Sequence, residues 1–359
     1  MEKQYLIFFD FLRFSIGSES EIPSSLKEAD WKELYRIAQK QCLVGILFDG
    51  ILKLPLAEVG MSKDLLLQWM MQCQMLEKAN VRLNDAAIQV SEWFRKKGFR
   101  TCILKGQGNA LLYPNGLHRT PGDIDIWVEG GDKRVISFVR SISPHEKACY
   151  HHIEFPSYKG VEVEVHYRPS FLLCFWHNRK LQKYYEKVKE EQFSHRVMLG
   201  EQGEIAIPTV EFNLIFQLTH IYAHLMNEGI GLRQLLDYYY VLISDDLLLI
   251  RDRVQKELKE LGLWKFAGAI MYIMQEVFGM PASRLIVPPN EKYGKFVLNE
   301  VLEAGNFGKH DARNRFGRSK LGHNLQRVYR DIRLVRYFPA EAMSEPFFRV
   351  WHFFWRIWH

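Results

Sequence analysis

The sequence predicts an α+β protein in which a small mixed β-sheet unit lies between two helical regions. Helical periodicity dominates the first quarter of the chain, β-rich segments cluster in the second quarter, and the helical pattern returns in the last two fifths. We therefore expect an N-terminal helical region over 1–97, an α/β core over 98–208 and a C-terminal helical domain over 209–359. A chain of 359 residues is long enough for two or three packed units.

The N-terminal region carries two amphipathic patterns. One begins at Asp30 and places Trp31, Leu34 and Ile37 on one helical face, and the other runs from Leu65 to about Phe94. Turn-forming residues separate the predicted helices, at Gly17, 21–25 and Pro55.

The middle region alternates strand and helix signals. We expect strands over 99–104 and 123–128, a short helix over 109–113 between them, and a helix over 133–141. Two further strands, 150–155 and 161–167, flank a turn-forming segment over 156–160 that is typical of a hairpin.

The C-terminal region is helical in pattern over 210–226, 231–243 and 246–278, with breaks at Pro281 and at the proline pair 288–289. The final residues, 347–359, are aromatic on all sides and include two arginines. Such a helix could dock in a core or against another chain, or it could lie on a membrane surface. Because it has no clean polar face, we favour docking.

Composition and charge narrow the class of protein. With 47% hydrophobic and 25% charged residues, the chain is globular rather than disordered. The net charge of +6 is concentrated between Lys309 and Arg336, a stretch that suits a polyanionic partner or a solvated helix face after a flexible loop. Five widely spaced cysteines form no CxxC pair, and no run of 18 apolar residues occurs, so we expect reduced thiols, no transmembrane segment and a cytoplasmic location.

The segment Asp123-Ile124-Asp125 is the first candidate site. Residues two apart in a strand point the same way, so the two carboxylates would share one face of the predicted strand. Mg²⁺ prefers oxygen ligands and is commonly held by one or two carboxylates together with substrate phosphates. The pair therefore predicts a metal site, although acidic pairs also occur as solvated residues at strand ends.

A second alternating segment, 161–166, offers a third carboxylate. It places Glu162, Glu164 and His166 on one face of a strand and three valines on the other. Strand parity does not choose between the two glutamates, and an exposed polar face on an edge strand is the alternative interpretation.

A resemblance to a known family emerges from these residues taken together. The order Leu104-Lys105-Gly106, Tyr113, Arg119, Asp123-Ile124-Asp125 and Glu164-Val165-His166-Tyr167 resembles the uncharacterised nucleotidyltransferase family within the DNA polymerase beta-like superfamily. The resemblance is strongest over 104–167, and weaker similarities lie at 219–224, 232–237 and 303–308. It implies a polymerase beta-like nucleotidyltransferase core flanked by helical domains.

The resemblance also implies roles for individual residues. Asp123 and Asp125 would bind two Mg²⁺ ions, with Mn²⁺ as a substitute, and Glu164 would be the third catalytic carboxylate. The resemblance further implies that six residues bind the nucleotide: Lys105, Gly106, Gln107, Arg119, His166 and Arg233. The sequence departs from the superfamily pattern where Gln107 precedes Gly108, and in having glutamate as its third acid.

The implied activity is transfer of a nucleoside monophosphate from an NTP to a hydroxyl group of an acceptor. The acceptor, whether small molecule, protein or RNA, cannot be read from the sequence, and no recognised RNA-binding module occurs. Two alternatives are a phosphotransferase that uses the same metals and a catalytically silent nucleotide-binding or interaction module.

Several other polar residues have two interpretations. His220 and His224 have zinc-chelating spacing but lack an HExxH glutamate, so they are expected to line the cleft or to be hydrogen-bonded in the interior. His151 and His152 precede the hairpin, and one of them would share the face of the carboxylates. Arg233 has i, i+4 spacing to an aspartate and is expected to form an intrahelical ion pair, unless it faces the nucleotide as the resemblance suggests.

Overall fold

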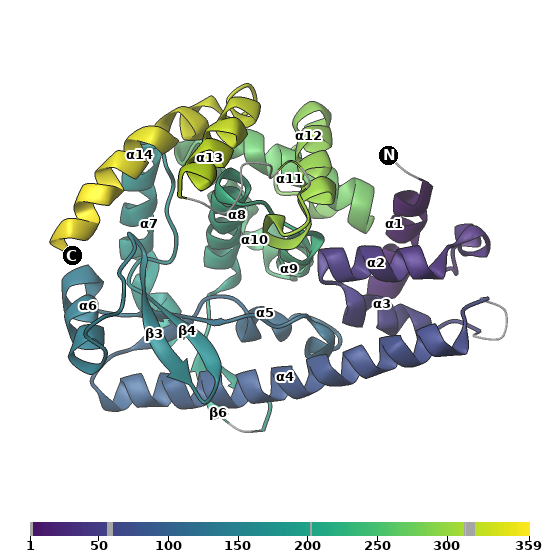
Figure 1. The fold of residues 1–359 in the computed structure, drawn as a ribbon, viewed down its shortest axis with the longest axis horizontal. Helices are drawn as coiled ribbons and strands as arrows, with labels where there is room; N and C mark the ends of the chain where they lie inside the picture. The colour runs from purple at the N-terminus through teal and green to yellow at the C-terminus, as the bar shows by residue number, and fades with distance from the viewer. Residues whose placement is uncertain (1–2, 56–59, 202, 312, 314–319) are drawn as a thin grey trace.

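The structure is a computed structural model and describes residues 3–55, 60–201, 203–311, 313 and 320–359. It is a mixed α+β fold in which helices flank a small sheet, which confirms the predicted fold class (Figure 1). The N-terminal helices are α1 (Lys3–Ile16), α2 (Trp31–Gln41), α3 (Val44–Ile51) and α4 (Lys63–Lys96). The elements of the middle region are β1 (Thr101–Ile103), α5 (Gln107–Ala110), β2 (Ile124–Val128), α6 (Gly131–Ile142), β3 (His152–Tyr158), β4 (Val161–His166), α7 (Phe175–Ser194), β5 (Arg196–Leu199) and β6 (Gly203–Ala206).

The C-terminal part of the chain is helical. Its helices are α8 (Val210–Asn227), α9 (Leu232–Leu242), α10 (Leu247–Glu260), α11 (Trp264–Phe278), α12 (Glu291–Ala304), α13 (Lys320–Leu334) and α14 (Pro339–Trp358). Short 3-10 turns lie at 24–28, 116–118, 282–284 and 306–308.

The central sheet has the strand order β1-β2-β4-β3. β2 runs parallel to β4, while β1 and β3 are antiparallel to their neighbours at the two edges. β5 and β6 form a separate two-stranded hairpin. The parallel pair at the centre aligns the start of β2 with the second half of β4, where the predicted carboxylates lie.

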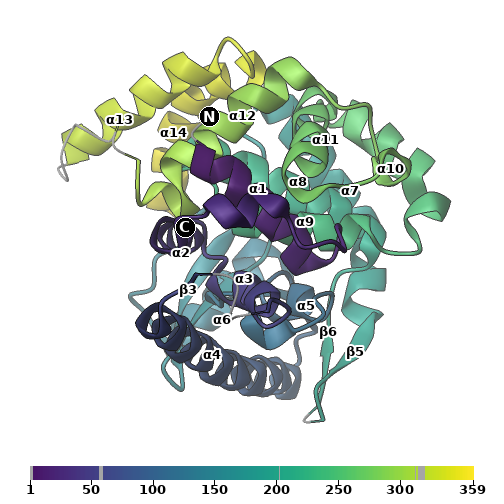
Figure 2. The same cartoon turned by 90° about the vertical axis from the view of Figure 1, so that its right-hand side faces the viewer.

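Helix α4 spans the two hydrophobic cores. Its first half packs into the helical core through Leu65 and Trp69, and its second half packs through Leu83, Val90 and Phe94 into the core beneath the sheet. Two views at right angles place α4 along one side of the sheet unit, with the C-terminal helices on the opposite side (Figures 1 and 2). One helix therefore connects the N-terminal region to the sheet.

Local sequence signals explain several helix starts. The side chain of Asp30 accepts hydrogen bonds from the backbone N–H groups of Lys32 and Glu33, and Thr209 accepts one from Phe212. Each satisfies donors that a helix N-terminus leaves without an intrahelical partner.

Three predicted boundaries are wrong. The hairpin turn is only Lys159-Gly160, not 156–160, because both residues have positive φ and a bulge carries β3 as far as Tyr158. The predicted helix over 246–278 is two helices, since Gly262 adopts φ +70° between α10 and α11. The short helix predicted over 109–113 is α5, which begins directly after Gly106.

The basic stretch between Lys309 and Arg336 is partly paired. Arg313 contacts Glu300 and Asp311, and Arg333 contacts Glu300, so these cations are already bound to acids. Arg315 and Arg318 lie outside the described residues.

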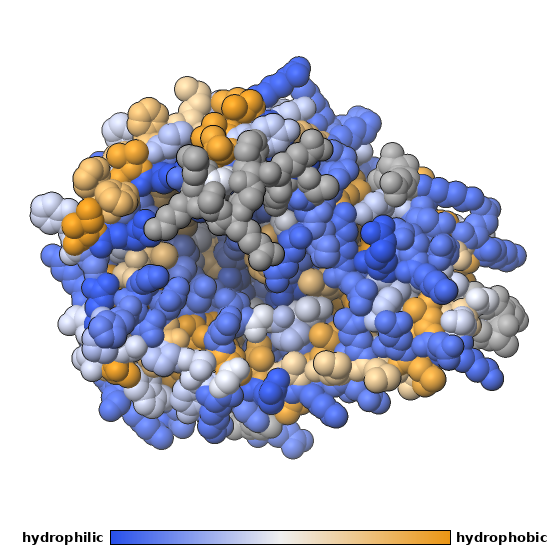
Figure 3. Space-filling model, viewed as in Figure 1, coloured by the Kyte–Doolittle hydropathy of each residue, from blue (hydrophilic) through white to orange (hydrophobic). Residues whose placement is uncertain are grey.

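The C-terminal aromatic run forms the end of α14. Phe348 and Trp355 contact Tyr150, whereas Phe347 and Trp358 are 78% and 82% exposed. Apolar residues are visible at the edge of the molecule where α14 lies in Figure 1 (Figure 3). One face of the helix therefore packs on the protein and another faces outward. Among the described residues, no helix is long and apolar enough to cross a membrane.

Candidate active site

Parallel strands β2 and β4 bring two carboxylates side by side. Asp125 is the register partner of Glu164, and each is flanked by apolar residues that belong to the core beneath the sheet. Partners in a parallel ladder point to the same face, so both acids lie on the face opposite that core. Asp123 directly precedes β2 and lines the same cavity as Asp125 and Glu164. Glu162, the other candidate from sequence parity, is exposed.

Asp125 has two cationic neighbours. The ammonium group of Lys105 lies 2.9 Å from Asp125 Oδ1, and His166 Nε2 lies 3.0 Å from the same oxygen. Burial favours a raised pKa for Asp125, but the charge of Lys105 and the hydrogen bond from His166 outweigh it and hold this pKa below its ordinary value. Asp125 is therefore ionised at neutral pH.

His166 joins Asp125 to Glu164. Its Nε2 atom is also 3.4 Å from Glu164 Oε2. Burial alone would lower the pKa of His166, but the hydrogen bonds to the two carboxylates raise it to about 9. The imidazolium and Lys105 together place positive charge between the acids.

The pKa of Asp123 shifts in the opposite direction from that of Asp125. The charge of Asp125, with burial, raises the pKa of Asp123 to about 6. Two nearby carboxylates that disfavour each other's ionisation make a local excess of negative charge, which a divalent cation relieves. The donor set of Asp123, Asp125 and Glu164 is made of carboxylate oxygens and fits Mg²⁺ or Mn²⁺ by ligand type.

Gly106 shapes the backbone beside the carboxylates. It has φ +50° and ψ −108° at the start of α5, a conformation that side chains disfavour. A Cβ atom there would come no closer than 3.6 Å to its nearest neighbour, the backbone oxygen of Asp123. The conformation, rather than lack of space, therefore calls for glycine.

The side chain of Gln107 points away from the carboxylates. It is 2% exposed, and its amide donates a hydrogen bond to Asn84 on α4. The structure thus brings Lys105 and Gly106 to the site, but not the side chain of Gln107.

Arg119 is held by Asp237 from α9. Arg119 Nε and Nη2 lie 2.7 and 2.8 Å from the two carboxylate oxygens of Asp237, and the hydroxyl of Tyr113 donates to the same carboxylate at 2.6 Å. The expected intrahelical pair between Arg233 and Asp237 is therefore wrong, because Arg119 holds both carboxylate oxygens of Asp237.

Arg233 faces a cavity that also contains Lys105, Asp123 and Asp125. Its Nη1 atom donates to the backbone oxygen of Thr120 at 3.0 Å, and its guanidinium lies over the ring of Phe307. No ion pair of Arg233 occurs in the described part of the chain, and its buried Nε atom has no hydrogen-bond partner there. Arg233 therefore presents a positive charge to the cavity beside the carboxylates.

Phe307 is a site residue to which the sequence analysis assigns no role. It lines both cavities around the carboxylates, contacts the ring of His224 at 5.1 Å and adopts φ +53°. Positive φ is rare for a bulky side chain and marks local strain. The available signal was its place in the segment 303–308, between two glycines that also have positive φ.

Five histidines (His151, His152, His166, His220 and His224) line the second cavity, which has a volume of about 350 Å³ and is also lined by Asp125 and Glu164. His220 Nε2 lies 3.1 Å from Lys105 Nζ and 2.9 Å from His224 Nε2, on the wall formed by α8. His151 and His152 lie on the opposite wall, at the start of β3. Both pairs lie in the cleft, as one of the two sequence interpretations expects.

Comparison with known proteins gives one family. The family model described as an uncharacterised nucleotidyltransferase matches residues 27–279. Among solved structures, an antigenic nucleotidyltransferase-like protein from Paracoccidioides brasiliensis matches with 13% identity and a TM-score of 0.29, over 50% of this chain and 90% of that one. No curated protein matches the chain.

Proposed function

Because the chain belongs to the uncharacterised nucleotidyltransferase family, we propose that it transfers a nucleoside monophosphate from an NTP to a hydroxyl group of an acceptor, with divalent metal ions. The observation that carries this proposal is the convergence of Asp123, Asp125 and Glu164 on one cavity beside Lys105. We also propose that the chain has three structural units. These are a nucleotidyltransferase core over 98–208 and the helical regions 1–97 and 209–359.

The nucleotide side of the proposed site is the cavity that Arg233 lines. Lys105 and Arg233 offer positive charge there, and the glycine conformation at Gly106 lets the backbone approach a phosphate closely. The ring of Phe307 offers an apolar surface to the same cavity. Arg119 supports this arrangement indirectly, since it binds Asp237 on the helix that carries Arg233.

Asp123, Asp125 and Glu164 would hold the metal ions. The ions would neutralise charge on the phosphates and lower the pKa of the acceptor hydroxyl. The acceptor oxygen forms a bond to the α-phosphorus, the bond from that phosphorus to pyrophosphate breaks, and the hydroxyl proton passes to Glu164. His166 orients Asp125 and Glu164 through its contacts with both carboxylates.

One observation favours a second candidate function. Lys105 and His166 already neutralise Asp125, so a module that binds nucleotides without turnover is compatible with the same contacts. The candidates are separated by incubating the protein with Mg²⁺ or Mn²⁺ and an NTP that is labelled at the α-phosphate or at the γ-phosphate. Transfer of an α-label supports nucleotidyl transfer, transfer of a γ-label indicates a phosphotransferase, and binding without transfer indicates the silent module.

A further inference from the structure

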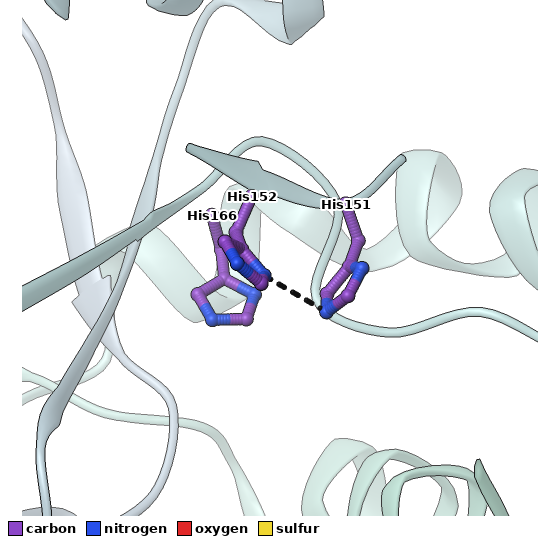
Figure 4. Close-up of side chains that lie close together, drawn as sticks. All are labelled: His151, His152 and His166. Carbon is purple, nitrogen blue, oxygen red and sulfur yellow. Dashed lines mark hydrogen bonds between the residues drawn. The ribbon is translucent and has the colours of Figure 1, made fainter. Parts of the chain in front are cut away.

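Three imidazole rings gather where β3 begins and β4 ends. His152 is the register partner of His166, and His151 directly precedes β3. The rings hang from the same side of the backbone, with a hydrogen bond between His151 and His152 (Figure 4). One nitrogen from each ring lies within 4.8 Å of the other two.

Glu164 adds an oxygen donor to this group. His151 Nε2 is 3.0 Å from His152 Nδ1, which is 3.7 Å from Glu164 Oε2, and His166 Nε2 is 3.4 Å from that oxygen. Two ligands at about 2.1 Å from a tetrahedral metal ion are separated by about 3.4 Å. The measured separations between donor atoms are therefore close to those of a tetrahedral metal site, and little rearrangement is needed to bind an ion.

The rings of His151 and His152 are half-buried, and His151 also packs against Phe171. The Nδ1 atom of His151 is buried and has no hydrogen-bond partner in the described part of the chain. An unsatisfied buried nitrogen is costly, so packing alone does not account for the position of this ring.

The nitrogen donors of the histidine group distinguish it from the proposed site at Asp123, where the ligands are carboxylate oxygens. Imidazole nitrogens suit zinc and its neighbours among the transition metals, whereas Mg²⁺ is held by oxygen. His220 and His224 on the opposite wall do not belong to the group, since they contact Lys105 and Glu228 instead.

We infer that His151, His152 and His166, together with Glu164, bind one Zn²⁺-class ion, for which His166 releases the proton that it shares with Asp125 and Glu164 in the metal-free protein. The role of this ion rests on the proposed function, in which Glu164 would hold it beside the metal ions that Asp123 and Asp125 bind. Its binding does not depend on that function and needs no nucleotide.

The test is a titration of the chelator-treated full chain with Co²⁺, whose visible absorption reports tetrahedral nitrogen ligands. We expect one ion per chain, displaced by Zn²⁺ and resistant to a large excess of Mg²⁺. The double substitution His151→Asn and His152→Asn should weaken binding at least about ten-fold. His145→Asn, at an exposed histidine of the same region, and Asp123→Asn should both retain the Co²⁺ spectrum.

The inference is overturned if Co²⁺ gives no tetrahedral spectrum, or if a correctly folded double variant binds it as tightly as the wild-type protein. If the double variant does not fold, the competition in the wild-type protein decides, since displacement of Co²⁺ by Mg²⁺ rejects nitrogen ligands. Failure of NTP transfer with intact Co²⁺ binding rejects the proposed function alone. Transfer without Co²⁺ binding rejects only the histidine site.

Discussion

Arg119 and Asp237 form a buried, two-point ion pair that connects the segment before β2 to helix α9. The pair fixes the carboxylate-bearing strand relative to the helix that carries Arg233 on the opposite side of the cavity. The site is therefore built across the sheet unit and the C-terminal helices, and its geometry depends on contacts between them.

Breaking this pair should destabilise the protein strongly. Asp237→Asn leaves the Arg119 guanidinium buried without a counter-charge, and the expected loss is about 3–5 kcal/mol of unfolding free energy. Urea unfolding measures it. Glu129→Gln, which breaks the exposed pair with Arg100, is the matched control and should cost less than about 1 kcal/mol. Equal losses in the two variants would show that the buried pair has no special role.

Arg233 should contribute to nucleotide affinity. Charge-assisted hydrogen bonds are worth about 1.5–3 kcal/mol, so Arg233→Gln should weaken NTP binding by roughly 10- to 100-fold. Isothermal titration calorimetry with a non-hydrolysable NTP analogue provides the measurement. Arg253→Gln, at an arginine on the exposed face of α10, should leave the affinity unchanged. Unaltered binding in the Arg233 variant would place the phosphates elsewhere.

Gly106 should be required for its backbone conformation. Gly106→Ala forces alanine into φ +50° and ψ −108°, which should cost about 1–3 kcal/mol of stability and reduce NTP binding. Gly98→Ala is the control, because Gly98 also has positive φ and lies at the end of α4, away from the carboxylates. Both variants should lower the melting temperature, and only the first should lose NTP affinity. Retained affinity in Gly106→Ala would exclude a role for this backbone in phosphate binding.

Asp123 should make the stability of the metal-free protein depend on pH. Its pKa of about 6 in the folded protein exceeds the ordinary 3.8, so the folded state binds this proton more tightly than the unfolded state. The resulting stabilisation is fully present below about pH 4 and is lost as the pH rises through 6. Unfolding of the wild-type protein and of Asp123→Asn, followed in a chelator across this range, should give curves that diverge from pH 4 to 6. Parallel curves would contradict the raised pKa.

Metal binding should have the opposite pH dependence. An ion binds the deprotonated carboxylate, so affinity should fall about ten-fold per pH unit below pH 6, where Asp123 takes up a proton. Titration of Mn²⁺ followed by electron paramagnetic resonance measures this slope. Asp123→Asn should bind Mn²⁺ weakly and without that dependence.

Strong local patterns made much of the fold and part of the site predictable. Alternation placed Asp123 and Asp125 at a strand and the valines of 161–165 in the core, because period-two patterns survive in any packed sheet. Helix periodicity identified α2, α4, α8 and α9 to within a few residues of their ends. Strand parity did not separate Glu162 from Glu164. The family resemblance chose Glu164, and the structure shows that Glu164 is the register partner of Asp125.

Other features depend on contacts between distant segments. The partner of Asp237 is Arg119, 118 residues away, which the i, i+4 spacing to Arg233 concealed. No element is predicted from sequence between residues 168 and 209, where α7 and the short strands β5 and β6 lie. Four-residue strands with mixed polarity carry too little pattern to be recognised alone. The position of Phe307 beside His224 likewise follows from tertiary packing.

The most direct test of the proposed nucleotidyl transfer is the transfer of α-labelled phosphate by carboxylate variants of the protein. Asp123→Asn, Asp125→Asn and Glu164→Gln should each reduce transfer at least about a hundred-fold, because each removes a proposed metal ligand. Glu162→Gln changes an exposed acid on β4, the strand that carries Glu164, and should retain wild-type transfer. Wild-type transfer in a folded Asp125→Asn variant would contradict a metal centre at β2 and β4.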